Sequence, residues 1–243
     1  MMGTERSISF GTSTIPFVVH RSARRSTVTI AVDLADGVLV LAPEELDGQA
    51  IDDVVREKGA WVVQRLAEFE ELGPPPPPRE FVSGESFSYL GRQYRLLVNR
   101  RAGCESAIVK LRGGWLETTI PEAGTQATLV RSALTAWYKG LAAKRIPERV
   151  RLYAERLGVD EPKVLVRDQA KRWGSCTSKG ELRFNWRIVM GPMSLVDYVV
   201  AHEVCHLRVA DHSARFWKLL GMIQPDHETR KERLRREGIN FRL

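Results

Sequence analysis

Two stretches of the chain alternate apolar and polar residues with a period of two. Residues 20–43 read HRSARRSTVTIAVDLADGVLVLAP, and residues 99–121 read NRRAGCESAIVKLRGGWLETTIP. Alternation that is rich in β-branched residues predicts half-buried strands. A turn is marked by Gly37 in the first stretch and by Gly113 with Gly114 in the second, and Pro43 or Pro121 ends the last strand. Each stretch therefore predicts two strands joined by a turn.

The two stretches also match each other along their length. Each is followed by an amphipathic segment, which reaches Trp61 in the first half and Trp137 in the second, and matching landmarks lie 76 to 79 residues apart. We interpret the halves as two related β-β-α units. Chance recurrence of a common arrangement, a hairpin followed by a helix, is the alternative.

Helical and strand signals alternate in the rest of the chain. Residues 137–158 have a helical pattern in which Pro147 is expected to end one helix and open another, and Gly158 to end the second. Residues 163–167 predict a strand, and residues 172–190 predict a hairpin that turns over positions 178–180. A further helix is expected after Pro192, with Ser194 as its N-cap and Asp197 favouring its first turn.

That last helix carries the pattern HExxH at residues 202–206. His202 and His206 are four residues apart, so their side chains leave one face of a helix about 5 to 6 Å apart. Two imidazoles in this arrangement can share one metal ion. Glu203 points about 100° away around the helix, close enough to reach a metal-bound water, which is the position of a general base.

A third ligand has to come from outside this helical turn. His212 follows His206 by six residues, and Ser213 can cap the next helix, so the chain can bend back and direct His212 at the ion. Cys205 also lies on the HExxH helix and could complete a closed, structural zinc site, although a buried core position suits it better. Tyr198, one turn before His202, either orients a transition-state oxyanion or packs in the core.

Composition and charge limit the class of protein. With 243 residues, 43% hydrophobic and 28% charged, the chain suits one large or two small soluble domains. We find no membrane span and no signal peptide in the sequence, so a cytoplasmic protein is expected. The three cysteines, Cys104, Cys176 and Cys205, are widely spaced without a CxxC, which disfavours disulfides and a zinc ribbon.

The net charge of +7 is unevenly distributed. Residues 1–72 hold 7 Lys and Arg against 12 Asp and Glu, a net charge of −5, and residues 73–243 hold 30 against 18, a net charge of +12. Five prolines, Pro74 to Pro78, separate the two parts and favour a stiff spacer. The basic part is expected to attract acidic partners, which allows weak association with nucleic acid. The acidic part either covers some of that surface or carries only its own solvated surface.

Several motifs together resemble a known family. The runs RWGSCTSKGELRFNW (172–186), DYVVAHEVCHL (197–207), DHSARFW (211–217) and RSARRSTV (21–28) are similar to the YgjP-like predicted metal-dependent hydrolases, relatives of the SprT-type and other gluzincin-like zinc peptidases. The resemblance implies that His202, His206 and His212 bind Zn²⁺ and that Glu203 is the catalytic base. It does not imply a particular substrate, and the cysteine-rich module of nucleic-acid-directed relatives is absent from this sequence.

The complete interpretation is an α+β protein. We expect an N-terminal α/β unit over residues 1–73, a proline-rich linker over 74–79, and a zincin-like metallopeptidase domain over 80–243, with the HExxH helix beside a small β-sheet. The expected function is zinc-dependent hydrolysis of a peptide or protein, without a membrane partner. The alternative is a basic module that binds nucleic acid or protein and has a structural or vestigial zinc site. Peptides are expected to bind by strand addition along five residues: Arg172, Trp173, Gly174, Ser175 and Cys176.

Overall fold

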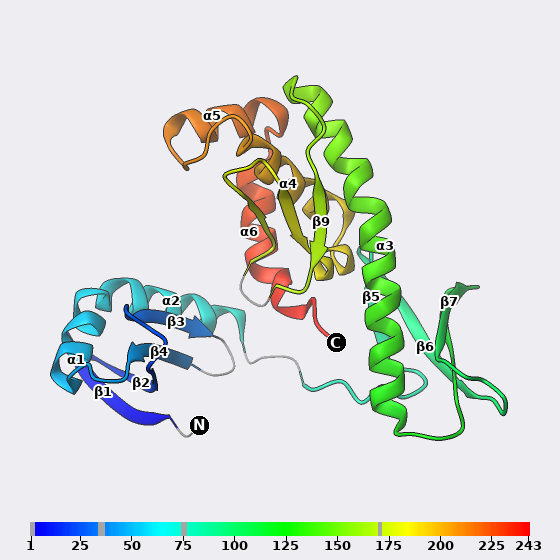
Figure 1. Ribbon diagram of the computed structural model, residues 1–243, viewed down its shortest axis with the longest axis horizontal. Helices are drawn as coiled ribbons and strands as arrows, with labels where there is room; N and C mark the ends of the chain where they lie inside the picture. Colours follow the sequence, from blue (N-terminus) through cyan, green and yellow to red (C-terminus); the bar gives the residue numbers. More distant parts are fainter. Residues whose placement is uncertain (1–2, 34–36, 74–76, 170–171) are drawn as a thin grey trace. The chain divides into compact units, whose positions relative to one another are not determined.

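The protein is a mixed α+β chain in two compact units. The computed structural model describes residues 3–33, 37–73, 77–169 and 172–243, and within them the chain forms six α-helices and three small mixed sheets (Figure 1). The units are Met1–Pro76 and Pro77–Leu243. Of the expected linker, Pro74 to Pro76 lie outside the described residues, and the division into 1–73, 74–79 and 80–243 stays a prediction. None of the described helices is long and apolar enough to cross a membrane.

The first unit is a four-stranded sheet with two helices. In chain order its elements are β1 (Thr4–Phe10), β2 (Ser13–Ser22), β3 (Thr29–Asp33), β4 (Gly37–Pro43), α1 (Gly48–Glu57) and α2 (Gly59–Leu72). The strand order is β1-β2-β4-β3, and only β2 and β4 are parallel. Apolar residues of the strands alternate in burial and join the helices in one core that includes Ile15, Val40 and Ile51.

The second unit begins with the same topology. Its first sheet contains β5 (Ser86–Tyr89), β6 (Arg92–Arg100), β7 (Ile108–Arg112) and β8 (Trp115–Ile120) in the order β5-β6-β8-β7, again with only the two central strands parallel. The repeat expected from the sequence is therefore confirmed, and it is larger than predicted because each copy has four strands.

Equivalent arginines hold the end of each repeat. The guanidinium of Arg21 donates to the carbonyls of Pro43, Glu44 and Leu46. In the second copy Arg100 donates to the carbonyls of Pro121, Glu122 and Gly124, at 3.1, 2.6 and 3.4 Å. Each arginine thus ties the end of its parallel strand to the loop that leads into the following helix.

A single long helix, α3 (Gln126–Leu157), follows the first sheet of the second unit. It runs along both sheets of that unit (Figure 1). The expectation that Pro147 separates two helices is wrong. Ile146 and Val150, on either side of the proline, are fully buried, and this packing holds the helix continuous despite the missing N–H donor. Gly158 ends the helix in the left-handed conformation, as expected.

The remaining elements build the C-terminal part. They are β9 (Val164–Arg167), β10 (Gly174–Cys176), β11 (Leu182–Asn185), the 3₁₀ helix η1 (Trp186–Met190), α4 (Met193–Cys205), α5 (Ala214–Ile223), α6 (His227–Glu237) and the 3₁₀ helix η2 (Gly238–Asn240). The expected strand at 163–167 and the hairpin turn at 178–180 are confirmed by the sheet β10-β11-β9. The hairpin is shorter than predicted, because Asn185 accepts from the N–H of Arg187 and starts η1.

The predicted cap of α4 is wrong. The helix begins at Met193 after Pro192, and no side chain caps it. Asp197 instead accepts two hydrogen bonds from the Arg149 guanidinium in α3, at 2.6 and 3.0 Å. The carboxylate thereby joins α4 to α3 across the core, rather than serving the first turn of its own helix.

Candidate metal centre

The candidate centre lies at the C-terminal end of α4. His202 and Glu203 belong to the last turn of the helix, and His206 is its C-cap residue with φ −65° and ψ −18°. The chain then makes a tight turn, in which the N–H groups of Arg208 and Val209 both donate to the carbonyl of Cys205 at 3.0 Å. Because the helix stops here, the chain can fold back over the face that carries the two histidines.

The fold-back brings His212 to His202. The two Nε2 atoms are 3.0 Å apart. Ser213 is the N-cap residue of α5, as expected, although its side chain makes no cap hydrogen bond and its N–H donates to Asp211 at 3.2 Å. Nδ1 of His206 lies 3.0 Å from the carbonyl oxygen of Val209. An Nδ1–H donated to that carbonyl leaves Nε2 of His206 with a free lone pair, as in many metal sites.

One aromatic side chain contacts all three histidines. Phe216, in α5, is fully buried, and its ring centroid lies 4.6 to 4.9 Å from the imidazoles of His202, His206 and His212. The His206 ring stacks on it at 29°, and the other two meet it at about 65°. Phe216 therefore fixes the orientation of the cluster from the core side.

Burial and neighbouring charges lower the pKa of two histidines of the cluster, His202 and His206. Burial, together with the charges of His206 and His212, lowers the pKa of His202 to about 3, and burial also lowers the pKa of His206. The ammonium of Lys231, 4.8 Å from the Trp217 ring centre, acts on the pKa of His202 in the same direction. Neutral imidazoles are the form that binds metal ions.

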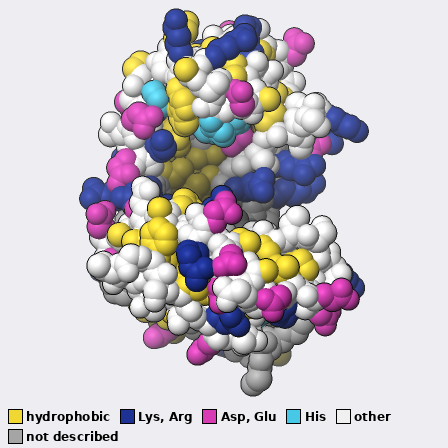
Figure 2. Space-filling model, turned by 90° about the vertical axis from the view of Figure 1, so that its left-hand side faces the viewer, with side chains coloured by type: hydrophobic (Ala, Val, Ile, Leu, Met, Phe, Trp, Pro, Cys, Tyr) yellow, Lys and Arg dark blue, Asp and Glu magenta, His cyan; other side chains and the backbone are white. Residues whose placement is uncertain are grey.

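The donor atoms fit one small divalent ion. One nitrogen from each of His202, His206 and His212 lies within 4.8 Å of the other two. Two nitrogens bound to a tetrahedral zinc are about 3.3 Å apart, a little more than the shortest separation here. No fourth His, Cys, Asp or Glu joins the group among the residues that the structure describes. Histidine side chains reach the surface beside hydrophobic ones in Figure 2. Three ligands and an open position are typical of catalytic rather than structural zinc.

Glu203 lies buried beside this cluster and under strand β10. It is 6% exposed, and a Cβ atom on Gly174 would come within 2.6 Å of its Cγ and Oε1 atoms. Only glycine leaves room for the carboxylate at this position. Burial raises the pKa of Glu203 to about 7, and the charge of Arg172 opposes this rise. Arg172 is itself exposed at the start of the strand.

Of the five expected substrate residues, Arg172 and Trp173 precede an edge strand, and the other three form it. Gly174, Ser175 and Cys176 form β10, which pairs with β11 and has no strand on its other side in the described part of the chain. Burial and Glu203 raise the pKa of the Cys176 thiol. The ring of Trp173 packs against Phe241 with the centroids 5.7 Å apart, as in a core residue, and its contact with substrate stays a prediction.

Two other candidates on α4 are core residues. Cys205 is fully buried, and desolvation raises the pKa of its thiol to about 12. Its expected role as a small core residue is confirmed. Tyr198 is buried as well, with its ring centroid 6.1 Å from that of His202. Its role in orienting an oxyanion stays a prediction.

Sequence reasoning assigned no role to Phe216 or to the carbonyl of Val209, and it did not foresee why residue 174 is a glycine. The spacing of four residues between His212 and Phe216 was an available signal. It was ambiguous, because α5 begins only after Ser213, so His212 lies outside the helix that carries Phe216. Gly174 and Glu203 are far apart in the sequence, so no local pattern predicts their contact.

Comparison with known proteins agrees with this geometry at the level of the family. The family model described as YgjP-like, metallopeptidase domain, matches residues 26–237. Two solved structures are similar to part of the chain. They are the metallopeptidase zymogens of Pyrococcus abyssi abylysin (19% identity, 37% of this chain and 90% of that chain, TM-score 0.35) and of Methanocaldococcus jannaschii jannalysin (18%, 37%, 92%, 0.34). A search of the curated proteins finds no match.

The packing of Gly174 on Glu203 gives a prediction that needs no substrate. Gly174→Ala should destabilise the protein by about 1 to 3 kcal/mol, because the new methyl group must displace a buried side chain. In a Glu203→Ala background the same change should cost little, since the obstructing atoms are gone. Chemical denaturation of the four proteins measures the coupling. Equal costs in both backgrounds would show that the two residues do not compete for this space.

Proposed function

Because the chain belongs to the YgjP-like family of metallopeptidase domains, we propose that it is a zinc-dependent peptidase. His202, His206 and His212 would hold the ion, and Glu203 would serve as the general base. The observation that carries the proposal is the convergence of three imidazoles next to a buried carboxylate, which shares helix α4 with His202. Zinc suits a ligand set made of imidazoles.

Each residue has a distinct part in this proposal. Zinc bound to the histidines would supply a Lewis acid that activates water and polarises the scissile carbonyl. The Glu203 carboxylate would take a proton from the attacking water and deliver it to the nitrogen of the leaving amine. The carboxylate is buried, and Gly174 leaves room for it beside the strand where a substrate would lie.

The open edge of β10 supports a peptide as substrate. An extended peptide can add to a sheet edge through main-chain hydrogen bonds, which give affinity with little sequence preference. At β10 such a peptide would pass close to Glu203, since Gly174 contacts that side chain. We therefore propose that Gly174 and Cys176 contact substrate through their backbone, because the bonds of Trp173 to Asn185 and of Thr177 to Glu181 direct the main-chain groups of Ser175 toward β11. Arg172 would stand at the entrance, with Trp173 as support from the core.

The first prediction separates proton transfer from metal binding. Glu203→Gln should keep the fold and near-stoichiometric zinc but lower hydrolysis of an unstructured protein such as casein by about 10²- to 10⁴-fold. His202→Ala and His206→Ala should lose the metal. Elemental analysis and mass spectrometry of the fragments give both quantities. Glu161→Gln, at an exposed glutamate paired with Arg151, is the control. Full peptidase activity in Glu203→Gln would exclude the general-base role.

The second prediction distinguishes an open from a closed site. His212→Ala should weaken zinc binding by more than the roughly 10- to 100-fold cost of losing an outer-shell partner. Cys205→Ala should leave the affinity nearly unchanged, because its thiol lies in the apolar core. Competition with a chromophoric chelator measures both, with His227→Ala in α6 as the matched histidine control. If Cys205→Ala lost as much affinity as His212→Ala, the site would be structural.

The third prediction concerns the substrate strand. The zinc-loaded Glu203→Gln protein should bind peptides without cleaving them, so a peptide with a photoreactive group can be trapped. Adducts are expected at residues 172–176. The other edge strand of the same sheet, β9, is the control, because β11 separates it from β10. Adducts that favour residues 164–167 would contradict binding at β10.

A further inference from the structure

The first sheet of the second unit has one buried and one open face. On the inner face, Leu96, Leu116 and Ile120 are fully buried against a core that includes α3. The residues that alternate with them point the other way, and most of them are exposed. We call these residues the outer face; they are Arg95, Leu97, Ile108, Lys110, Arg112, Trp115, Glu117 and Thr119.

A tryptophan stands between two arginines on this outer face. Trp115 pairs with Arg95 across the parallel strands and with Arg112 across the antiparallel hairpin. Gly113 and Gly114, both with positive φ, form the two-residue turn that sets Arg112 directly opposite Trp115. Trp115 is 39% exposed, although a side chain of this size usually covers more of its surface.

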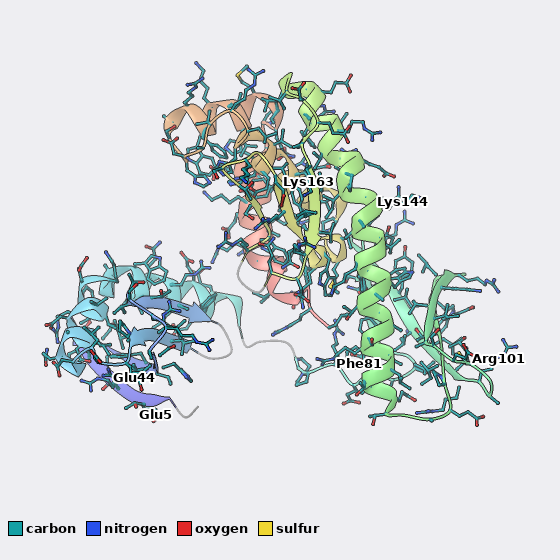
Figure 3. All side chains as sticks on the ribbon, viewed as in Figure 1. Glu5, Glu44, Phe81, Arg101, Lys144 and Lys163 are labelled. Atoms are coloured by element: carbon teal, nitrogen blue, oxygen red, sulfur yellow. The ribbon has the colours of Figure 1, made fainter. Side chains whose placement is uncertain are left out.

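A loop extends this surface into a hollow. Residues 101–106, between β6 and β7, line a cavity of about 540 Å³ together with Lys110, Arg112 and Glu117 of the outer face. Figure 3 shows Arg101 beyond the end of β6, on the side of the sheet away from α3. The surface thus presents four cations, Arg95, Arg101, Lys110 and Arg112, against two carboxylates, Glu105 and Glu117. None of the four cations forms an ion pair with the described residues.

The first unit offers an internal comparison. The repeat aligns Arg95, Trp115 and Arg112 with Pro16, Gly37 and Asp33 at the corresponding sheet positions. The shared fold therefore does not require either an aromatic or a basic residue there. The stability of the sheet therefore does not explain why Arg95, Trp115 and Arg112 stand together in the second unit. A role in binding explains it.

We propose that the outer face of β5-β6-β8-β7 binds single-stranded nucleic acid. An exposed indole gives a platform on which one base can stack, and the flanking guanidinium groups are placed to contact the adjoining phosphates. The cavity beneath residues 101–106 would receive the next part of the strand. An acidic peptide would satisfy the cations but would leave the indole without a planar partner, and a duplex hides its base faces.

This surface is separate from the candidate metal centre, and the proposal does not depend on peptidase activity. The outer face belongs to the first sheet, whereas the histidines lie on α4 and the segment that leads to α5. A binding measurement therefore tests it whether or not the protein cleaves peptides.

Fluorescence anisotropy with the full chain and labelled single strands of about 12 nucleotides, DNA and RNA, tests the proposal. Trp115→Ala should weaken binding about tenfold at fixed salt with an unchanged salt slope, and Trp115→Phe should retain most of the affinity. Arg112→Gln should reduce the slope of log K against log salt by about 0.7, the value for one lost phosphate contact on a single strand.

Two matched variants complete the experiment. Trp61→Ala removes an exposed tryptophan of α2, 47% exposed, and Lys144→Gln removes an exposed cation of α3 (Figure 3); both should leave affinity and slope unchanged. Equal affinities of Trp115→Ala and Trp61→Ala would overturn the proposal. So would the absence of saturable binding at low salt, tighter binding of a duplex, or equal displacement by a polyglutamate peptide of the same charge.

Discussion

The candidate centre depends on holding three imidazoles with their nitrogens facing one another in a half-buried place. Without a metal ion, nitrogen lone pairs that face one another do not attract. The surrounding packing therefore has to hold the three imidazoles together. Phe216 contacts all three rings and is fully buried, and His206 is fixed further by the Val209 carbonyl. This arrangement requires α4 to stop at Cys205 and α5 to start directly after Ser213. The end of α4, the tight turn after it and the start of α5 are all needed to bring the three histidines together.

The rest of the second unit supports this cluster from behind. The long helix α3 packs against both sheets and, through Arg149 and Asp197, against α4. Strand β10 covers Glu203, and the glycine at position 174 allows that close approach. The repeated four-stranded fold explains why two parts of one chain can share topology and differ in surface. The buried positions keep the sheet, while the outward positions carry Pro16 and Gly37 in one copy and Arg95 and Trp115 in the other.

Local patterns predicted the parts of the structure that depend on nearby residues. The spacing of His202, Glu203 and His206 fixes their relative directions on a helix, and the glycines at 113 and 114 fix a hairpin. Two local rules failed because a distant partner outweighed them. Pro147 should break a helix, yet buried neighbours on both sides keep α3 continuous, and Asp197 pairs with Arg149 instead of helping to cap α4. Local patterns could not predict the contacts of Phe216 and Gly174 either, because these contacts arise only when separate elements pack together.

We propose that His202, His206 and His212 hold one zinc ion with a position left open. Anomalous diffraction at the zinc absorption edge, from crystals of the zinc-loaded full chain, tests this most directly. We expect a single strong peak within about 2.0 to 2.1 Å of one nitrogen from each of the three histidines, with no sulfur ligand. A peak bonded to the Cys205 sulfur at about 2.3 Å, or a peak away from the three histidines, would contradict it.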